Sequence, residues 1–181
     1  MKTFSKLALV SLLLVSMAAF VACSSAKSKV DFAGSPEWYN NPVKGCGVGS
    51  AKLRRIRSLA RDSAVASARA DLSRALKTTT QGMLKKYMAE GEADEKDFSE
   101  ELTTSVVRDV TENTLVGTRV AATANVGQEL FAMVCLDPET FADAFDRMNR
   151  LSQKAREALK ARAKAEFDDM DEQLEKLRDR Q

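Results

Sequence analysis

Gly45-Cys46-Gly47-Val48-Gly49-Ser50 opens the stretch that decides the fold, and an alanine-rich segment follows it as far as residue 76. Apolar residues in that segment recur every three or four positions, which places them on one face of an α-helix; they are Leu53, Ile56, Ala60, Ala64, Ala68, Leu72 and Leu76. Alanine in the middle of this face lets another element approach the helix backbone closely. We predict a buried helix that begins near residue 51 and runs toward residue 88, with any kink at the poor helix formers of residues 78–82.

The glycine-rich entry does not match a nucleotide-binding loop. The dinucleotide fingerprint requires a third glycine where this chain has Ser50, and the lysine-serine pair of a phosphate-binding loop is missing. A short first strand around residues 46–48, with close backbone approach at its glycines, fits the residues better.

Two further strands are predicted in the middle of the chain, after a shorter helix. Asp97 or Ser99 is the expected cap of that helix, and its apolar residues repeat every fourth position: Phe98, Leu102, Val106 and Val110. The periodicity changes from helix to strand around residues 112–114. Residues 115–126 then alternate between apolar and polar, Gly127-Gln128 provides a turn, and residues 130–136 return with both faces apolar.

A strand that is apolar on both faces is usually central in its sheet. The first strand is therefore expected to pair with the free edge of the third, in the strand order first, third, second. This order makes Cys46 and Cys135 neighbours and predicts a disulfide between them; the alternative is two separate buried cysteines that act as small apolar residues.

The C-terminal part is predicted to be one long helix. Asp137-Pro138-Glu139 is a strong helix start, and no glycine or proline follows it. From residue 151 a narrow apolar stripe runs along a charged rod, with a basic block before an acidic block. Such a helix would project beyond a small domain, so we expect either self-association of residues 151–181 in an antiparallel arrangement or a solvated tail without a partner.

The N-terminus resembles an export signal followed by a lipidation site. Lys2 and Lys6 precede an apolar run over residues 7–21, and Phe20-Val21-Ala22-Cys23 resembles the cleavage box of bacterial lipoproteins, with phenylalanine where leucine is commonest. The resemblance implies that Cys23 is acylated, and Ser24-Ser25 resembles lipoproteins sent to an outer membrane. The alternatives are an uncleaved anchor or an ordinary signal. The predicted organisation is a signal peptide (1–22), a tether (23–35), an α+β domain (36–149) and a charged helical extension (150–181).

The composition excludes several classes of function. The chain has no histidine, which removes the commonest general base and metal ligand, so we expect neither an enzyme nor a metal site nor a cofactor. Two of the 28 Lys and Arg residues lie in the predicted signal peptide. Its removal leaves 26 Lys and Arg against 26 Asp and Glu, a formal net charge of zero. Zero net charge and export both argue against a nucleic-acid partner.

Two groups of residues are candidates for contact with a partner. Trp38 and Tyr39 stand between Pro36 and Pro42, in a passage expected to be irregular, where Trp38 either closes one end of the core or contacts a ligand. The second group consists of cations near the expected start of the long helix: Arg54, Arg55, Arg57 and Arg61, together with Lys52. They form either a solvated face or a surface for anionic lipid headgroups or a neighbouring subunit.

Taken in order, the motifs resemble the LPP-twenty lipoprotein family, which includes flagellum-associated outer-membrane lipoproteins. The matching residues are the box at Cys23, Pro36-Glu37-Trp38, Gly47-Val48-Gly49-Ser50-Ala51, the run from Ala64 through Ala68-Arg69-Ala70-Asp71-Leu72, and Leu136-Asp137 after the closing strands. The resemblance implies a small α+β domain held at a membrane, without catalytic residues. The charged C-terminal segment departs from the family.

These observations predict an α+β protein with a small, mainly antiparallel three-stranded sheet against a long alanine-rich helix and a shorter helix, and a projecting C-terminal helix. The expected function is that of a non-enzymatic lipoprotein of the cell envelope, anchored through Cys23 to lipid of the outer membrane, with a structural or assembly role; the sequence leaves open whether that role is in motility. Its partners would be lipid, further copies of itself, and other envelope or flagellar proteins. The alternative is a periplasmic or surface binding module for a cell-wall polymer or an envelope protein.

Overall fold

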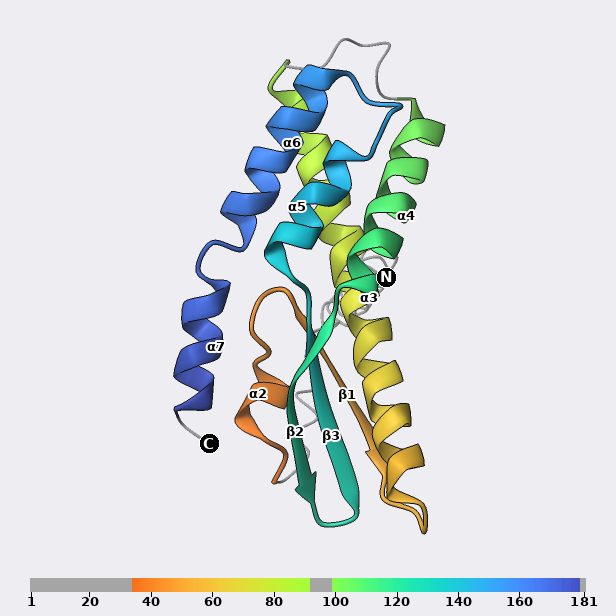
Figure 1. Ribbon diagram of the computed structural model, residues 1–181, viewed down its shortest axis with the longest axis vertical. Helices are drawn as coiled ribbons and strands as arrows, with labels where there is room; N and C mark the ends of the chain where they lie inside the picture. The colour runs from red at the N-terminus through yellow and green to blue at the C-terminus, as the bar shows by residue number, and fades with distance from the viewer. Residues whose placement is uncertain (1–33, 92–98, 180–181) are drawn as a thin grey trace, which may run out of the picture. The chain divides into compact units, whose positions relative to one another are not determined.

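The computed structural model describes residues 34–91 and 99–179, which belong to one compact unit, Phe32–Gln181. The elements in chain order are α2 (Glu37–Asn40), β1 (Cys46–Lys52), α3 (Arg57–Ala89), α4 (Glu100–Val116), β2 (Arg119–Val126), β3 (Glu129–Cys135), α5 (Pro138–Asp146), α6 (Gln153–Glu166) and α7 (Met170–Arg178) (Figure 1). This is the predicted α+β class, with a three-stranded antiparallel sheet.

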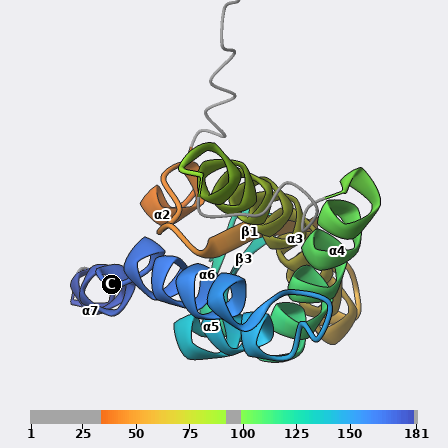
Figure 2. The same cartoon turned by 90° about the horizontal axis from the view of Figure 1, so that it is seen from above.

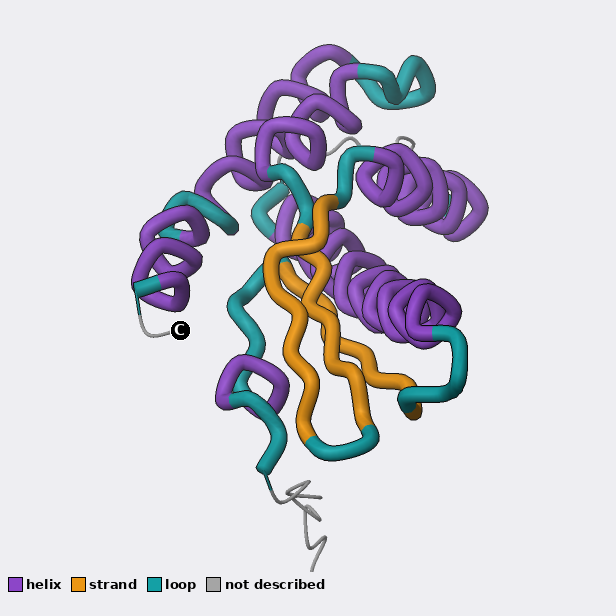
Figure 3. The backbone as a smooth tube through the Cα atoms, turned by 60° about the horizontal axis from the view of Figure 1, so that its bottom comes forward, coloured by secondary structure: helices purple, strands orange, loops and turns teal. Residues whose placement is uncertain are grey.

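The sheet has the predicted order β1-β3-β2. Cys46 lies opposite Cys135 in the register of β1 and β3, and the two residues form a disulfide, as predicted. Residues 130–135 of the central strand are all buried. Helix α3 covers one face of β1 and β3, whereas α2 lies against the other face, where Tyr39 meets Phe131 edge to face at 4.8 Å (Figure 3).

The contact between β1 and α3 depends on glycine. A Cβ atom added at Gly47 would lie 2.4 Å from the Ala68 carbonyl oxygen, and one added at Gly49 would lie 2.4 Å from the Ala68 amide nitrogen. Ala64 and Ala68 are fully buried on the facing side of the helix. The predicted close approach of strand and helix backbones is therefore confirmed.

The beginning of the long helix was predicted too early. Strand β1 continues to Lys52, and the Leu53 amide donates to the Gln128 carbonyl oxygen at 2.7 Å, so the chain is still part of the sheet where a helix was expected. Helix α3 begins only at Arg57, and Ile56 is its exposed N-cap. The helix continues through residues 78–82 to Ala89 because its far half is buried against other helices, with Leu84 and other residues in the core.

The change from helix to strand was also misplaced. The Ser99 hydroxyl caps α4 by accepting a hydrogen bond from the Leu102 amide, so of the two predicted caps, Asp97 and Ser99, the second is confirmed. The helix, however, continues to Val116, and β2 begins only at Arg119. Buried Thr111 and Thr114 look like strand residues in the sequence, yet their hydroxyls donate to carbonyl oxygens one helical turn earlier. An irregularity between residues 120 and 122 then shifts the register of β2.

The prediction of a single projecting C-terminal helix is wrong. Residues 138–178 form three helices, and Ser152 caps α6 by accepting from the Ala155 amide. The apolar stripe faces the domain core, where its buried members are Leu151, Ala155, Leu159, Ala163, Phe167, Met170 and Leu174. Figure 2 shows α6 beside α5, with α7 continuing outward from it. Because the stripe packs within the chain, residues 150–179 are part of the domain and not an extension of it.

Candidate functional site

Trp38 lies in a short helix on the sheet face opposite α3. Helix α2 begins after Pro36, so the passage expected to be irregular contains one helical turn. The Trp38 side chain is only 6% exposed and belongs to the main core cluster, in agreement with the interpretation that it closes one end of the core. Its remaining exposed edge lines a groove between α2, β2 and α7.

This groove has a volume of about 600 Å³. Its walls combine apolar and polar side chains: Pro36, Glu37, Trp38, Asn41, Val43, Thr123, Ala124, Gln173, Lys176 and Leu177. A second hollow of about 480 Å³ lies further along β2 and α7, between Arg119 and Arg178, and Leu177 lines both. The two hollows follow strand β2, which is an edge strand of the sheet, and helix α7.

The arginines predicted as partner contacts lie near the start of α3 and not beside the groove. Arg54 and Arg55 are in the connection between β1 and α3, and Arg57 and Arg61 are in the first turns of α3. All four are exposed. Trp38 and these arginines therefore do not form one site, because α2 and α3 cover opposite faces of the sheet and Arg54 lines a separate hollow.

The start of α3 is electrostatically unusual. It has no acidic residue in its first turn, and no side chain caps it. Arg57 and Arg61 oppose the positive end of the helix dipole, which makes them unfavourable for helix stability. None of the ion pairs seen among the described residues involves Arg54, Arg55, Arg57 or Arg61.

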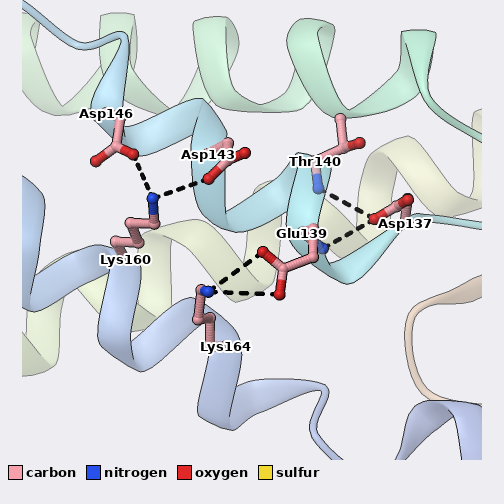
Figure 4. A network of polar contacts seen from close by, with 7 residues as sticks. All are labelled: Asp137, Glu139, Thr140, Asp143, Asp146, Lys160 and Lys164. Carbon is pink, nitrogen blue, oxygen red and sulfur yellow. Dashed lines mark hydrogen bonds and ion pairs between the residues drawn. The ribbon is translucent and has the colours of Figure 1, made fainter.

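A polar network between α5 and α6 holds the C-terminal segment on the domain (Figure 4). The Lys160 ammonium contacts Asp143 at 2.9 Å and also binds Asp146, while Lys164 contacts Glu139 at 3.2 Å. The hydrogen bond and the charge of Lys160 lower the pKa of Asp143, and the Asp146 and Asp143 carboxylates raise the pKa of Lys160. These carboxylates are satisfied by partners on a neighbouring helix, which is a structural arrangement and not that of a general acid or base.

One structural polar contact escaped the sequence interpretation. The Val48 amide points outward from edge strand β1 and donates to the Asp71 carboxylate at 3.1 Å, and Arg74 in turn contacts Asp71 at 3.0 Å. Asp71 thus accepts a hydrogen bond from a backbone amide of the edge strand that has no strand beside it to pair with. The run Ala68-Arg69-Ala70-Asp71-Leu72 had been noted in the sequence, but nothing in its spacing indicates that Asp71 reaches β1.

Within residues 34–91 and 99–179, no group of His, Cys, Asp or Glu side chains is arranged to hold a metal ion, and no helix is long and apolar enough to cross a membrane. Cys23, the predicted lipidation site, lies outside the described residues. No protein-family model and no curated protein matches the chain. The resemblance to the LPP-twenty lipoproteins therefore stays a prediction.

Proposed function

We propose that this protein is a lipoprotein of the bacterial cell envelope, anchored through acylated Cys23, with a structural or assembly role and without enzymatic activity. The N-terminal sequence supports the anchor: a basic start, an apolar run over residues 7–21 and Ala22-Cys23 have the order that lipoprotein processing requires. The structure describes the chain from Gly34 onward, eleven positions after Cys23 in the sequence.

The observation that carries the proposal is the disulfide between Cys46 and Cys135. It joins neighbouring strands inside the core, and both cysteines are buried. Such bonds form and persist in oxidising compartments and are rare in the cytosol. Export by the N-terminal segment would deliver the chain to such a compartment, so the signal and the disulfide support the same location by independent chemistry.

The intact mass of the natively produced protein tests both parts of this proposal. We expect a mass that begins at Cys23 and includes acyl chains, with no thiol alkylated in the unfolded protein until it is reduced. A Cys23→Ser variant is the matched control and should lose the acyl mass while it keeps the disulfide. An unacylated wild-type mass would refute the anchor, and alkylation of the unfolded protein without reduction would refute the oxidising location.

A binding module is the second candidate, and the groove beside Trp38 favours it. Grooves of this size with an aromatic wall and a few polar groups are typical of ligand sites. Two variants distinguish the groove from the basic surface. Leu177→Ser changes the groove wall and leaves the arginines unchanged, whereas replacement of Arg54, Arg55, Arg57 and Arg61 by alanine leaves the groove unchanged. Loss of binding to a cell-wall polymer or envelope protein only with Leu177→Ser would assign the ligand to the groove; loss only with the arginine variant would assign it to the basic surface.

A further inference from the structure

Two large apolar side chains are exposed at the corner between β1 and α3. Ile56 is 60% exposed and Leu59 is 56% exposed, although the helical periodicity of the sequence had placed Ile56 on a buried face. Ile56 is the N-cap of α3, and Leu59 lies three residues later in its first turn. Beside Leu59 is a shallow hollow of about 340 Å³ that also includes Lys52 and Arg54.

Cations surround these apolar residues. Lys52, Arg54, Arg55, Arg57 and Arg61 are all exposed, and the described residues provide none of them with an ion pair. The nearest acidic residue on α3 is Asp62, and Glu129, the first residue of β3 and opposite Lys52 in the register, accepts a hydrogen bond from Ser50 at 3.0 Å. We call residues 52–61 the basic corner. Exposed apolar side chains among cations without ion pairs fit an anionic lipid surface. The apolar side chains can insert between the lipid headgroups, and the lipid phosphates can neutralise the cations.

The basic corner lies at the same end of the sheet as Gly34, the first residue that the structure describes. A Cβ atom at Gly34 would contact Val126 at 3.4 Å, and Val126 is the last residue of β2 before the hairpin turn. The Leu53 amide donates to Gln128 in the same turn at 2.7 Å. The chain enters the domain next to the hairpin, and the basic corner begins beside that hairpin.

The length of chain between Cys23 and Gly34 limits how far an anchored domain can lie from the membrane. Cys23 precedes Gly34 by eleven residues, and a chain of that length spans at most about 40 Å when fully extended. Acylation at Cys23 would therefore keep this end of the sheet near the bilayer, and the high local concentration favours docking that would be weak for a free domain.

We propose that the basic corner docks on the membrane that holds the anchor, with Ile56 and Leu59 at the level of the headgroups and the five cations on anionic phospholipid phosphates. The proposal deepens the proposed function and rests on its lipid anchor. In this orientation the other end of α3, at Ala89, points away from the bilayer. Each cation removed is expected to weaken docking about fivefold.

Fluorescence of the intact acylated protein in vesicles tests this orientation. Ser58, which is exposed between the two apolar residues, is replaced by cysteine and labelled with an environment-sensitive dye; the disulfide and the acylated Cys23 do not compete for the label. Ala89→Cys is the matched control, since it is also exposed and lies at the far end of the same helix. In vesicles containing phosphatidylglycerol we expect the dye at residue 58 to shift to shorter wavelength and the dye at residue 89 to remain unchanged.

Two variants separate the contributions, and both change exposed side chains so that folding is preserved. Ile56→Ser with Leu59→Ser should abolish the shift at residue 58, and Arg55→Gln with Arg57→Gln should reduce docking and increase its sensitivity to salt. Lys85→Gln with Lys86→Gln, which removes two exposed cations near the other end of α3, is the control and should have no effect.

The outcomes also distinguish the docking from the anchor. Protein that floats with the vesicles while the dye at residue 58 stays in water would overturn docking and leave the anchor intact. Protein that does not float with vesicles would overturn the anchor itself. An equal shift in purely zwitterionic vesicles would overturn the role of the cations. Protection of residue 58 only when a second envelope protein is added would overturn the lipid assignment in favour of a protein partner.

Discussion

Replacing Gly49 by alanine is predicted to be strongly destabilising. The added Cβ atom would lie 2.4 Å from the Ala68 amide nitrogen and 2.5 Å from the Ala64 carbonyl oxygen, and both are backbone atoms of α3. Cβ contacts shorter than 3.0 Å essentially never occur, so strand and helix must separate by at least about 0.6 Å along a contact that spans two turns of helix. Overpacking of a close-packed core costs about 1–3 kcal/mol when side chains can adjust. Backbone atoms have no rotamer to change, so we expect about 3 kcal/mol or more.

Urea unfolding of the oxidised protein, followed by far-ultraviolet circular dichroism, measures this effect as a lower midpoint with an unchanged slope. Gly82→Ala is the matched control, because Gly82 lies within α3 and an added Cβ would meet nothing within 4 Å. Alanine there should stabilise the protein by up to about 1 kcal/mol through helix propensity. Ser67→Gly should fail to rescue Gly49→Ala, since the closest contacts are with the helix backbone. A loss below about 0.5 kcal/mol for Gly49→Ala would contradict the close approach of β1 and α3.

Three further predictions concern the contacts that hold the fold. Asp71→Ala should cost about 1–2 kcal/mol more than Asp71→Asn in urea unfolding, because an asparagine oxygen still accepts from the Val48 amide; equal costs would contradict that contact. Lys160→Met removes the partner that lowers the pKa of Asp143 from its ordinary value of 3.8. The stabilisation by this pair is present above pH 3.8 and is lost as the pH falls through the lower pKa of Asp143 in the folded state. Wild type and variant should therefore differ in unfolding midpoint at pH 7, and the difference should disappear as the pH falls through that lower pKa; a difference independent of pH would contradict the pair. Reduction of the disulfide, which closes a loop with a sequence separation of 89, should lower the stability by about 2–5 kcal/mol; an unchanged midpoint after complete reduction would contradict its contribution.

The sheet could be predicted because its signals are local and strong. Both faces of residues 130–135 are apolar, which only a central strand explains, and the two-residue turn at Gly127 determines which strand is its neighbour. With one edge of β3 assigned, β1 had a single edge left, and the pairing of Cys46 with Cys135 followed from the strand order.

The start of α3 and the end of α4 could not be predicted, because the local sequence pattern and the tertiary contacts disagree there, whereas the caps at Ser99 and Asp137 were predicted. Leu53 and Ile56 continue the helical spacing of Ala60, yet the Leu53 amide is held by the hairpin turn and Ile56 is exposed. Apolar spacing reports which residues would share a face if the helix formed, and gives no information about whether anything covers that face. The exposed pair Ile56 and Leu59 was missed for this reason.

The C-terminal stripe shows the same ambiguity between a partner in the chain and a partner in another molecule. Its apolar spacing was equally compatible with an antiparallel dimer, but Phe167 and Met170 pack next to Gly45, at the entrance to the glycine-rich strand. Deletion of residues 151–181 would therefore remove part of the core and could not separate self-association from unfolding. Reversal of exposed charges tests self-association without disturbing the stripe. If an antiparallel dimer formed, Lys154→Glu would weaken it, and Lys154→Glu combined with Asp168→Lys would restore it. Because the stripe is already buried within the chain, we expect both variants to have the same number of subunits as the wild type when their mass is measured in solution. A lower subunit number in Lys154→Glu that the double variant reverses would show that this segment mediates self-association.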